Sequence, residues 1–157
     1  MIQFLVSDTE LSGSGWMSMR LSLPDNEPVL FHSFSYVVDS PAALVSAVTA
    51  LLKGADRQFI LFQYEPSADL LEISRIDDIL TFQLHSFSGD TAPWSLAEAV
   101  DAIGSVTMQP LGSAAARPFA RALLRALRST PARLYRAQWM KAYPHSAPHQ
   151  LERTLAS

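Results

Sequence analysis

In residues 16–23 every second residue is a methionine or a leucine, and this two-residue period limits what the chain can fold into. The side chains that share one side of the segment are Met17, Met19, Leu21 and Leu23. Successive side chains of a β-strand point to opposite faces, so the pattern predicts a strand with one buried face and with Arg20 on the other. Apolar and β-branched segments between turn residues predict five more strands, at residues 2–7, 29–38, 57–64, 70–76 and 79–87.

Residues 39–54, which read DSPAALVSAVTALLKG, change to a helical period. Their apolar stripe consists of Leu44, Val48, Leu51 and Leu52. Ser40 suits the N-cap, Pro41 the first helical position and Gly54 the position after the helix, so we predict a helix over residues 41–52. A second, shorter helix is predicted over residues 96–104, because Ser95 and Glu98 fit the S-x-x-E capping box.

The predicted order of elements is three strands, a helix, three strands and a helix. Runs of adjacent short strands favour antiparallel pairing. We therefore predict an α+β fold with an antiparallel sheet of about six strands (βββαβββα). The helices are expected on one face of this sheet, which leaves the other face for water or a partner.

The C-terminal third is rich in arginine. In residues 116–129 one helical side is apolar, with Phe119, Leu123, Leu124 and Leu127. The opposite side carries Arg117, Arg121, Arg125 and Arg128. Thr130 and Pro131 end this helix and start a second one over residues 131–143, which predicts an arginine-rich helical hairpin.

We expect a single domain over residues 1–157. Its α+β core spans residues 1–103, the helical hairpin and the linker before it span residues 104–143, and residues 144–157 form a flexible tail. The linker is placed at residues 106–115, which contain Pro110 and Gly112.

Composition excludes several classes of protein. The chain is 48% hydrophobic and 17% charged, which suits a packed core and not a disordered chain. The absence of cysteine excludes disulfides, thiolate metal sites and cysteine nucleophiles. The start of the chain lacks the features of a signal peptide, and no segment approaches the roughly 18 apolar residues of a membrane span. We therefore expect a cytoplasmic protein that does not enter a membrane.

Charge is distributed unevenly along the chain, whose formal net charge is −3. Residues 1–102 hold 14 acidic and 4 basic side chains, whereas residues 103–157 hold 1 acidic and 8 basic side chains. Such asymmetry indicates two surfaces of opposite sign or two halves that attract each other. We expect part of the arginine side to pair with the acidic half.

The four histidines form no recognisable metal motif. His32 falls on the apolar side of its predicted strand, which indicates a core histidine. His145 and His149 are four residues apart, but they flank a proline and no HExxH pattern surrounds them, so we predict no metal or cofactor. His85 falls with Thr81 on the more polar side of its strand.

Acidic residues gather around the predicted fourth to sixth strands. They are Glu65, Asp69, Glu72, Asp77 and Asp78. Aspartates at a hairpin turn are explained by turn chemistry and predict no catalytic pair across a cleft. We interpret the group as a docking surface for a basic partner, with Arg20 and His85 on the exposed face of the sheet.

Residues 2–100 resemble the small bacterial immunity proteins of polymorphic-toxin and contact-dependent-inhibition systems, in particular the WapI-like type. The similar elements are the Trp16-x-x-x-Arg20 strand, the helix at residues 41–52, and Glu65-Pro66 followed by an alternating strand. The resemblance implies a protein that binds and blocks one cognate toxin and has no catalytic residue.

We therefore expect a non-enzymatic, protein-binding protein. One alternative is a small-molecule enzyme that uses His85 with a nearby carboxylate. Another is an accessory protein that binds nucleic acid through the arginine helices from Arg117 to Arg136, on the side that carries Arg121, Arg125 and Arg128. The sequence pI of about 5.7 argues against nucleic acid as the partner.

Overall fold

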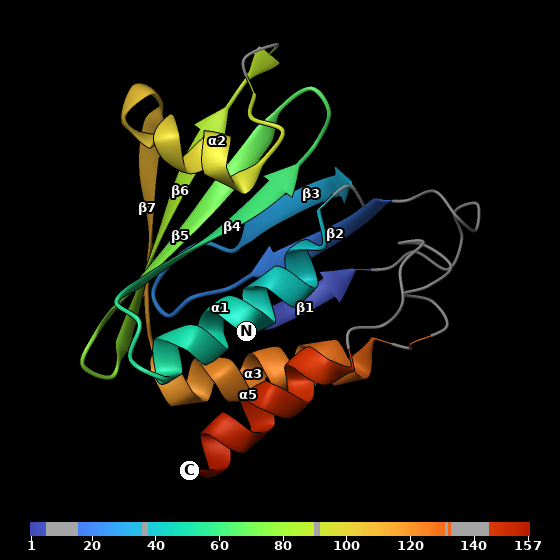
Figure 1. Cartoon of the computed structure of the whole chain (residues 1–157). Coiled ribbons are helices and arrows are strands. Elements are labelled where there is room, and N and C mark those ends of the chain that lie inside the picture. The colour runs from blue at the N-terminus through green and yellow to red at the C-terminus, as the bar shows by residue number, and fades with distance from the viewer. Residues whose placement is uncertain (6–15, 36–37, 90–91, 131, 133–144) are drawn as a thin grey trace.

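The computed structural model describes residues 1–5, 16–35, 38–89, 92–130, 132 and 145–157. Its strands form two antiparallel sheets (Figure 1). The three-stranded sheet has the order β1-β2-β3 and consists of β1 (Ile2–Leu5), β2 (Trp16–Leu21) and β3 (Val29–Ser35). The four-stranded sheet has the order β4-β5-β6-β7 and consists of β4 (Arg57–Gln63), β5 (Ala68–Ile76), β6 (Ile79–Phe87) and β7 (Thr107–Ala115).

The α+β class, the antiparallel pairing and all six predicted strands are confirmed. The single sheet is wrong, because β3 and β4 lie near each other without pairing, and α1 (Ser40–Leu52) separates them along the chain. A seventh strand, β7, occupies the predicted linker. Pro110 and Gly112 disguise it in the sequence, and both are tolerated because β7 is an edge strand with a bulge opposite Phe82 and Gln83.

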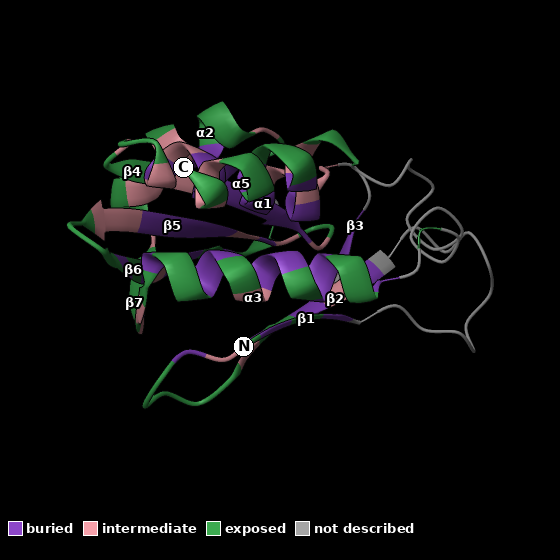
Figure 2. Cartoon of the chain, turned by 90° about the horizontal axis from the view of Figure 1, so that it is seen from below, coloured by how far each residue is buried: buried purple, intermediate pink, exposed green. Residues whose placement is uncertain are grey.

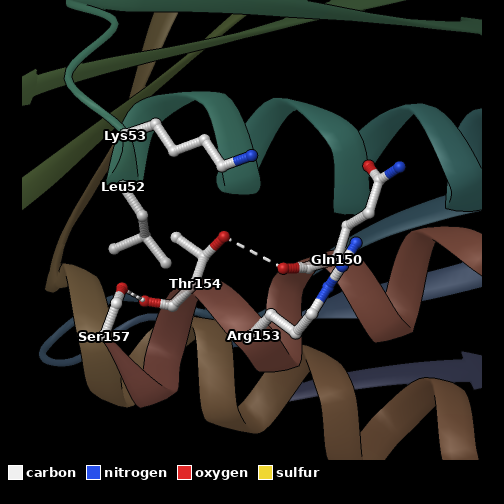
Figure 3. A pocket seen from close by; sticks show the side chains of 6 residues that line it. All are labelled: Leu52, Lys53, Gln150, Arg153, Thr154 and Ser157. Carbon is white, nitrogen blue, oxygen red and sulfur yellow. Dashed lines mark hydrogen bonds between the residues drawn. The ribbon is translucent and has the colours of Figure 1, made fainter.

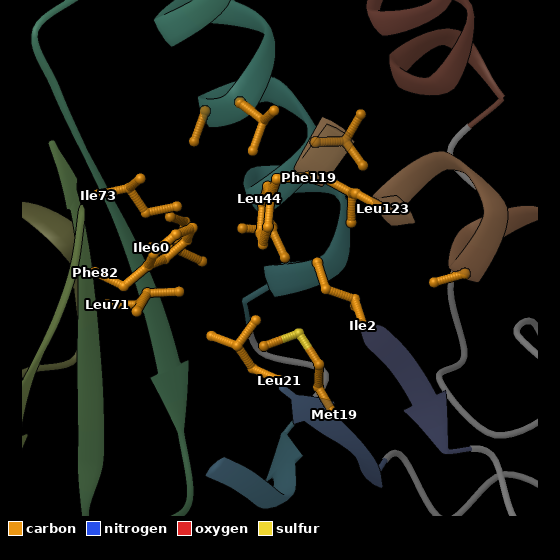
Figure 4. Packing of buried hydrophobic residues seen from close by; sticks show 14 of the residues in the cluster. Ile2, Met19, Leu21, Leu44, Ile60, Leu71, Ile73, Phe82, Phe119 and Leu123 are labelled. Atoms are coloured by element: carbon orange, nitrogen blue, oxygen red, sulfur yellow. The ribbon is translucent and has the colours of Figure 1, made fainter. Parts of the chain in front are cut away.

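One apolar core lies between the two sheets and is closed by helices (Figure 4). The four-stranded sheet contributes Ile60, Ile73 and Phe82 from its inner face, and α1 contributes Leu44. The rings of Phe31 and Phe62, one from each sheet, have centroids 4.4 Å apart. Each large side chain that is fully buried contributes about 1.5–3 kcal/mol, so this core is the main stabilising element of the fold.

The helix α1 begins one residue earlier than predicted. Asp39, and not Ser40, is the N-cap, since its Oδ1 accepts a hydrogen bond of 3.1 Å from the Ala42 backbone N–H. Ser40 instead donates its hydroxyl to the carbonyl of Leu61, which ties the start of α1 to β4. Gly54 follows the helix with a φ of +109°, as expected for a C-terminal stop.

The short helix α2 (Leu96–Asp101) packs on the outer face of the four-stranded sheet, against a second apolar cluster. The Ser95 half of the predicted capping box is confirmed, because the Ser95 Oγ accepts a hydrogen bond from the Glu98 backbone N–H. Glu98 reaches back to the Trp94 backbone N–H and not to that of Ser95. The expectation that helices cover one face of the sheet is therefore wrong, because α1 and α3 cover the inner face and α2 covers part of the outer one.

The arginine-rich helix α3 (Ala116–Ser129) confirms the predicted amphipathic pattern. Phe119, Leu123 and Leu127 are buried, while the arginine side is exposed, as the alternating burial along α3 shows in Figure 2. The predicted second helix of the hairpin falls on residues 131 and 133–143, which lie outside the described residues.

The prediction of a flexible tail is wrong for its last residues, which form the helix α5 (Ser146–Ala156). This helix packs against α1 and α3, with Leu151 fully buried.

Arg128 of α3 forms an ion pair of 2.6 Å with Glu152 of α5, and its hydrogen bond and charge lower the pKa of that carboxyl. Arg117 donates to the carbonyl of Leu155. Two residues of the arginine side, Arg117 and Arg128, are thus held by α5, whereas the expected pairing was with the acidic half of the chain.

His32 does not lie in the core as predicted, because a bulge changes the register between β2 and β3. Met17 faces Phe34 and Met19 faces Phe31, so three residues of β3 span the distance of two in β2. Both phenylalanines consequently point inward, and His32 is exposed.

Within the described part of the chain, no helix combines the length and hydropathy needed to cross a membrane.

Gly112 is a position where the fold requires glycine. Its φ is +123°, and a Cβ built there meets the Asn26 side chain, which is held by its own hydrogen bond to the Pro24 carbonyl. We therefore expect Gly112→Ala to lower the free energy of unfolding by about 1–3 kcal/mol, measured by urea denaturation.

The matched control is Gly104→Ala. A Cβ at Gly104 has no neighbour within 4 Å, and its φ is outside the positive range. The stability of this variant should stay within about 0.5 kcal/mol of the parent. Equal losses in the two variants would contradict the constraint at Gly112.

Candidate functional site

Among the residues that the structure describes, those that cover the outer face of the four-stranded sheet gather at one end of it. α2 and the residues after it bury Leu61, Leu70 and Phe87, which lie near that end of the strands. Toward the β5–β6 hairpin the same face is uncovered, and we name this part the open sheet face. Its exposed side chains are Arg57, Ile76, Ile79, Thr81, Met108, Pro110, Ser113 and Ala115.

The open sheet face is largely apolar and nearly uncharged. Ile76 is 74% exposed, Ile79 45% and Met108 46%. Ile76 and Ile79 pair across the hairpin, and Ile79 pairs in turn with Ala115, so they form one continuous row. Arg57 is the one charged residue among the exposed side chains of this face. A continuous apolar patch on a sheet is typical of a surface that another molecule covers.

A buried polar cluster lies between the covered and the open parts of the outer face. Glu72 of β5 and His85 of β6 are 6% and 5% exposed. His85 Nε2 lies 2.8 Å from Glu72 Oε2, and Arg57 Nε lies 3.1 Å from Glu72 Oε1. The carboxylate thus has one buried hydrogen-bond partner and one cation at the surface, which together compensate its desolvation.

The second ring nitrogen of His85 has no such partner. Nδ1 is buried and makes no hydrogen bond within the part of the chain that the structure describes. With Glu72 ionised, Nε2–H is the donor and Nδ1 carries the lone pair of a base. Because His85 is 5% exposed, solvent and a substrate do not reach this atom in the structure. The pair of His85 and Glu72 therefore has the composition of a catalytic dyad, but a substrate cannot reach its basic nitrogen.

The structure does not bring the predicted site residues into one surface. Arg20 and His85 belong to different sheets, and His85 is buried, so the shared exposed face is wrong. Arg20 is exposed on β2. The prediction that His85 and Thr81 lie on the same face of their strand is confirmed.

The five predicted acidic residues are also dispersed, because alternate residues of β5 point to opposite faces. Asp69 lies on the inner face and accepts hydrogen bonds from Tyr64 at 2.8 Å and from Ser86 at 2.7 Å. Burial, then the charge and hydrogen bond of Asp69, raise the pKa of the Tyr64 hydroxyl, which therefore stays a donor. Glu72 is buried on the outer face.

The other three acidic residues lie at the two ends of the strands. Glu65 is exposed and accepts a hydrogen bond of 3.1 Å from the Ser35 hydroxyl. Asp77 and Asp78 form the exposed turn of the β5–β6 hairpin, beside the open sheet face. A role of these acidic residues in binding stays a prediction, but the five residues do not form one acidic patch.

A separate hollow of about 480 Å³ lies between the ends of α1 and α5 (Figure 3). Its polar side chains are Lys53, Gln150, Arg153, Thr154 and Ser157. None of these is a carboxylate or an imidazole, so this hollow contains no acid–base pair. The two cations lie near the C-terminal ends of helices, where unpaired carbonyls favour positive charge, and this accounts for them.

Comparisons of the chain with protein-family models, with curated proteins and with solved structures give no match. In the described ranges, no three histidine, aspartate or glutamate side chains gather as metal ligands. The function therefore has to be argued from the open sheet face and the buried cluster alone. The residues that sequence analysis missed here are Arg57, Ile76, Ile79 and Met108, of which only Met108 lies in the unpredicted strand.

The buried pair should behave as a unit in stability measurements. Glu72→Leu leaves buried His85 without its carboxylate partner, and His85→Leu leaves Glu72 Oε2 without the imidazole while Oε1 keeps Arg57 and Ser74. Each variant should cost about 1–3 kcal/mol of unfolding free energy. The double variant removes both groups and should cost less than the sum, by about 0.5–3 kcal/mol, in urea denaturation. Strict additivity of the two losses would show that the contact contributes nothing.

Proposed function

We propose that the protein binds another protein through the open sheet face. The observation that carries this proposal is the exposed apolar side chains of the open sheet face, on a sheet that helices cover elsewhere: Ile76 and Ile79 form a row at the hairpin, and Met108 lies farther along, opposite His85. Leaving such a patch in water is costly, and a protein partner that buries it gains the corresponding hydrophobic free energy. The flat shape of a sheet suits a broad protein surface better than a small ligand.

The partner in this proposal is a basic protein. Asp77 and Asp78 border the open sheet face at the hairpin, and the exposed Glu98 and Asp101 lie on α2, beside its covered end. Acidic groups around an apolar centre accelerate encounter with a basic surface and fix its orientation. Arg57, held by Glu72, would then pair with an acidic group of the partner near the centre of the contact.

Within this class we propose an immunity protein that neutralises a cognate toxin in the cytoplasm. The resemblance of residues 2–100 to immunity proteins supports this choice, as does the burial of His85. A protein that inhibits by binding needs a shaped surface and no reactive group, which fits the open sheet face.

Binding should depend on the open sheet face. Thr81→Arg places a long charged side chain beside the row of Ile76 and Ile79, and Met108→Arg places one on the edge strand β7, farther along the face. Each should weaken binding by at least about tenfold. The measurement is titration calorimetry against the purified product of the adjacent gene, with Leu30→Arg as the control, because Leu30 is 44% exposed on the other sheet. If the adjacent gene encodes no toxin and its product does not bind, the proposal is wrong.

The contact between His85 and Glu72 favours a second candidate, an enzyme that uses this pair as a base. It differs from the first in its requirement for His85, since His85→Gln would abolish turnover but leave a contact on the open sheet face intact. A variant that still neutralises the toxin would count for binding. Loss of a measurable activity together with full retention of binding would count for the enzyme.

A further inference from the structure

The four arginines on the exposed side of α3 are not equivalent. Arg117 and Arg128 are held by α5, through the Leu155 carbonyl and the Glu152 carboxylate. Arg121 and Arg125 lie between them, one helical turn apart, and neither has an ion pair or hydrogen bond with any residue that the structure describes. Two cations of the stripe are therefore available to a partner.

Arg125 stands at the rim of an apolar groove between α3 and the start of β1. One part of the groove has a volume of about 560 Å³ and is lined by Ile2, Ala122 and Ala126 besides Arg125. The adjoining part has a volume of about 250 Å³ and is lined mainly by apolar residues, among them Phe119. Both parts share Met1 and Ala122, and the Met1 side chain is 80% exposed.

We propose that this groove binds an acidic segment of another protein, one that carries large apolar side chains next to its carboxylates. The apolar side chains would fill the groove, and the carboxylates would pair with Arg125 and Arg121. Small residues on the α3 side, Ala122 and Ala126, let the backbone of such a segment approach closely. Charge complementarity selects an acidic partner, because the lining of the groove contains the cation of Arg125 and no acidic side chain, and Arg121 is one helical turn away on α3.

A nucleic acid fits this groove less well than an acidic peptide. Phosphate backbones need several cations in a row, and two of the four arginines are already held by α5. The apolar lining has no aromatic side chain exposed for stacking on bases, since Phe119 is 6% exposed. The groove therefore favours apolar side chains over a sugar–phosphate chain.

This surface lies on another side of the molecule from most of the open sheet face, and Ala115, at the end of β7, borders both. α3 packs on the inner side of the fold, against β1, α1 and α5, whereas the open sheet face is the outer side of β4 to β7 (Figure 2). The inference does not rest on the proposed function, and a protein with both surfaces would hold a basic partner on one side and an acidic segment on the other.

The test is a selection from a displayed library of random peptides against the full chain. The expected result is enrichment of peptides that combine aspartate or glutamate with large apolar residues. The double variant Arg121→Glu/Arg125→Glu should bind those peptides at least about tenfold more weakly in fluorescence anisotropy. Absence of enrichment, or equal binding by the double variant, overturns the proposal.

Two further variants separate a groove from a general charge effect. Ala122→Phe fills the groove without changing any charge and should also weaken the selected peptides, with an unchanged circular dichroism spectrum. Arg153→Glu removes an exposed cation of α5 that does not line the groove, and it should bind as the parent does. If Arg153→Glu weakens binding as much as the double variant, or if a labelled single-stranded oligonucleotide displaces the peptides, the groove is not a peptide site.

Discussion

The fold depends on one apolar core that both sheets share. Because the three-stranded sheet, α1 and α3 all pack against the inner face of the four-stranded sheet, that face is fully used. The outer face is left with a helix of 6 residues, which covers one end and no more. The open sheet face is therefore a consequence of how the core is built, and the described residues leave its apolar side chains exposed.

In the ion pairs that the structure describes, charges are compensated by partners on neighbouring strands or helices. Glu72 is buried and compensated by His85 and Arg57, which lie on the strands on either side of it. In the C-terminal part the one carboxylate, Glu152, pairs with Arg128. The acidic and basic surfaces consequently stay available at different places, which is the arrangement that two different partners require.

Local patterns predicted the local structure well. The two-residue period located β2, and the apolar stripes located α1 and α3. The division into two sheets was not predicted, because it depends on which strand edges meet. The strand β7 and the helix α5 were not predicted either, because Pro110 and Pro148 usually interrupt such elements, although an edge strand and the first turn of a helix accept proline. His85 could be placed on a polar strand face, but its contact with Glu72, thirteen residues away, required the register of β5 and β6.

The most direct test of the account is hydroxyl-radical footprinting of the protein with and without its partner. Met108 and Ile79 lie on the open sheet face, whereas Leu30 is similarly exposed on the three-stranded sheet. The account predicts that the proposed partner protein protects Met108 and Ile79 from oxidation and leaves Leu30 unchanged. Protection of Leu30 with Met108 still fully reactive would contradict it.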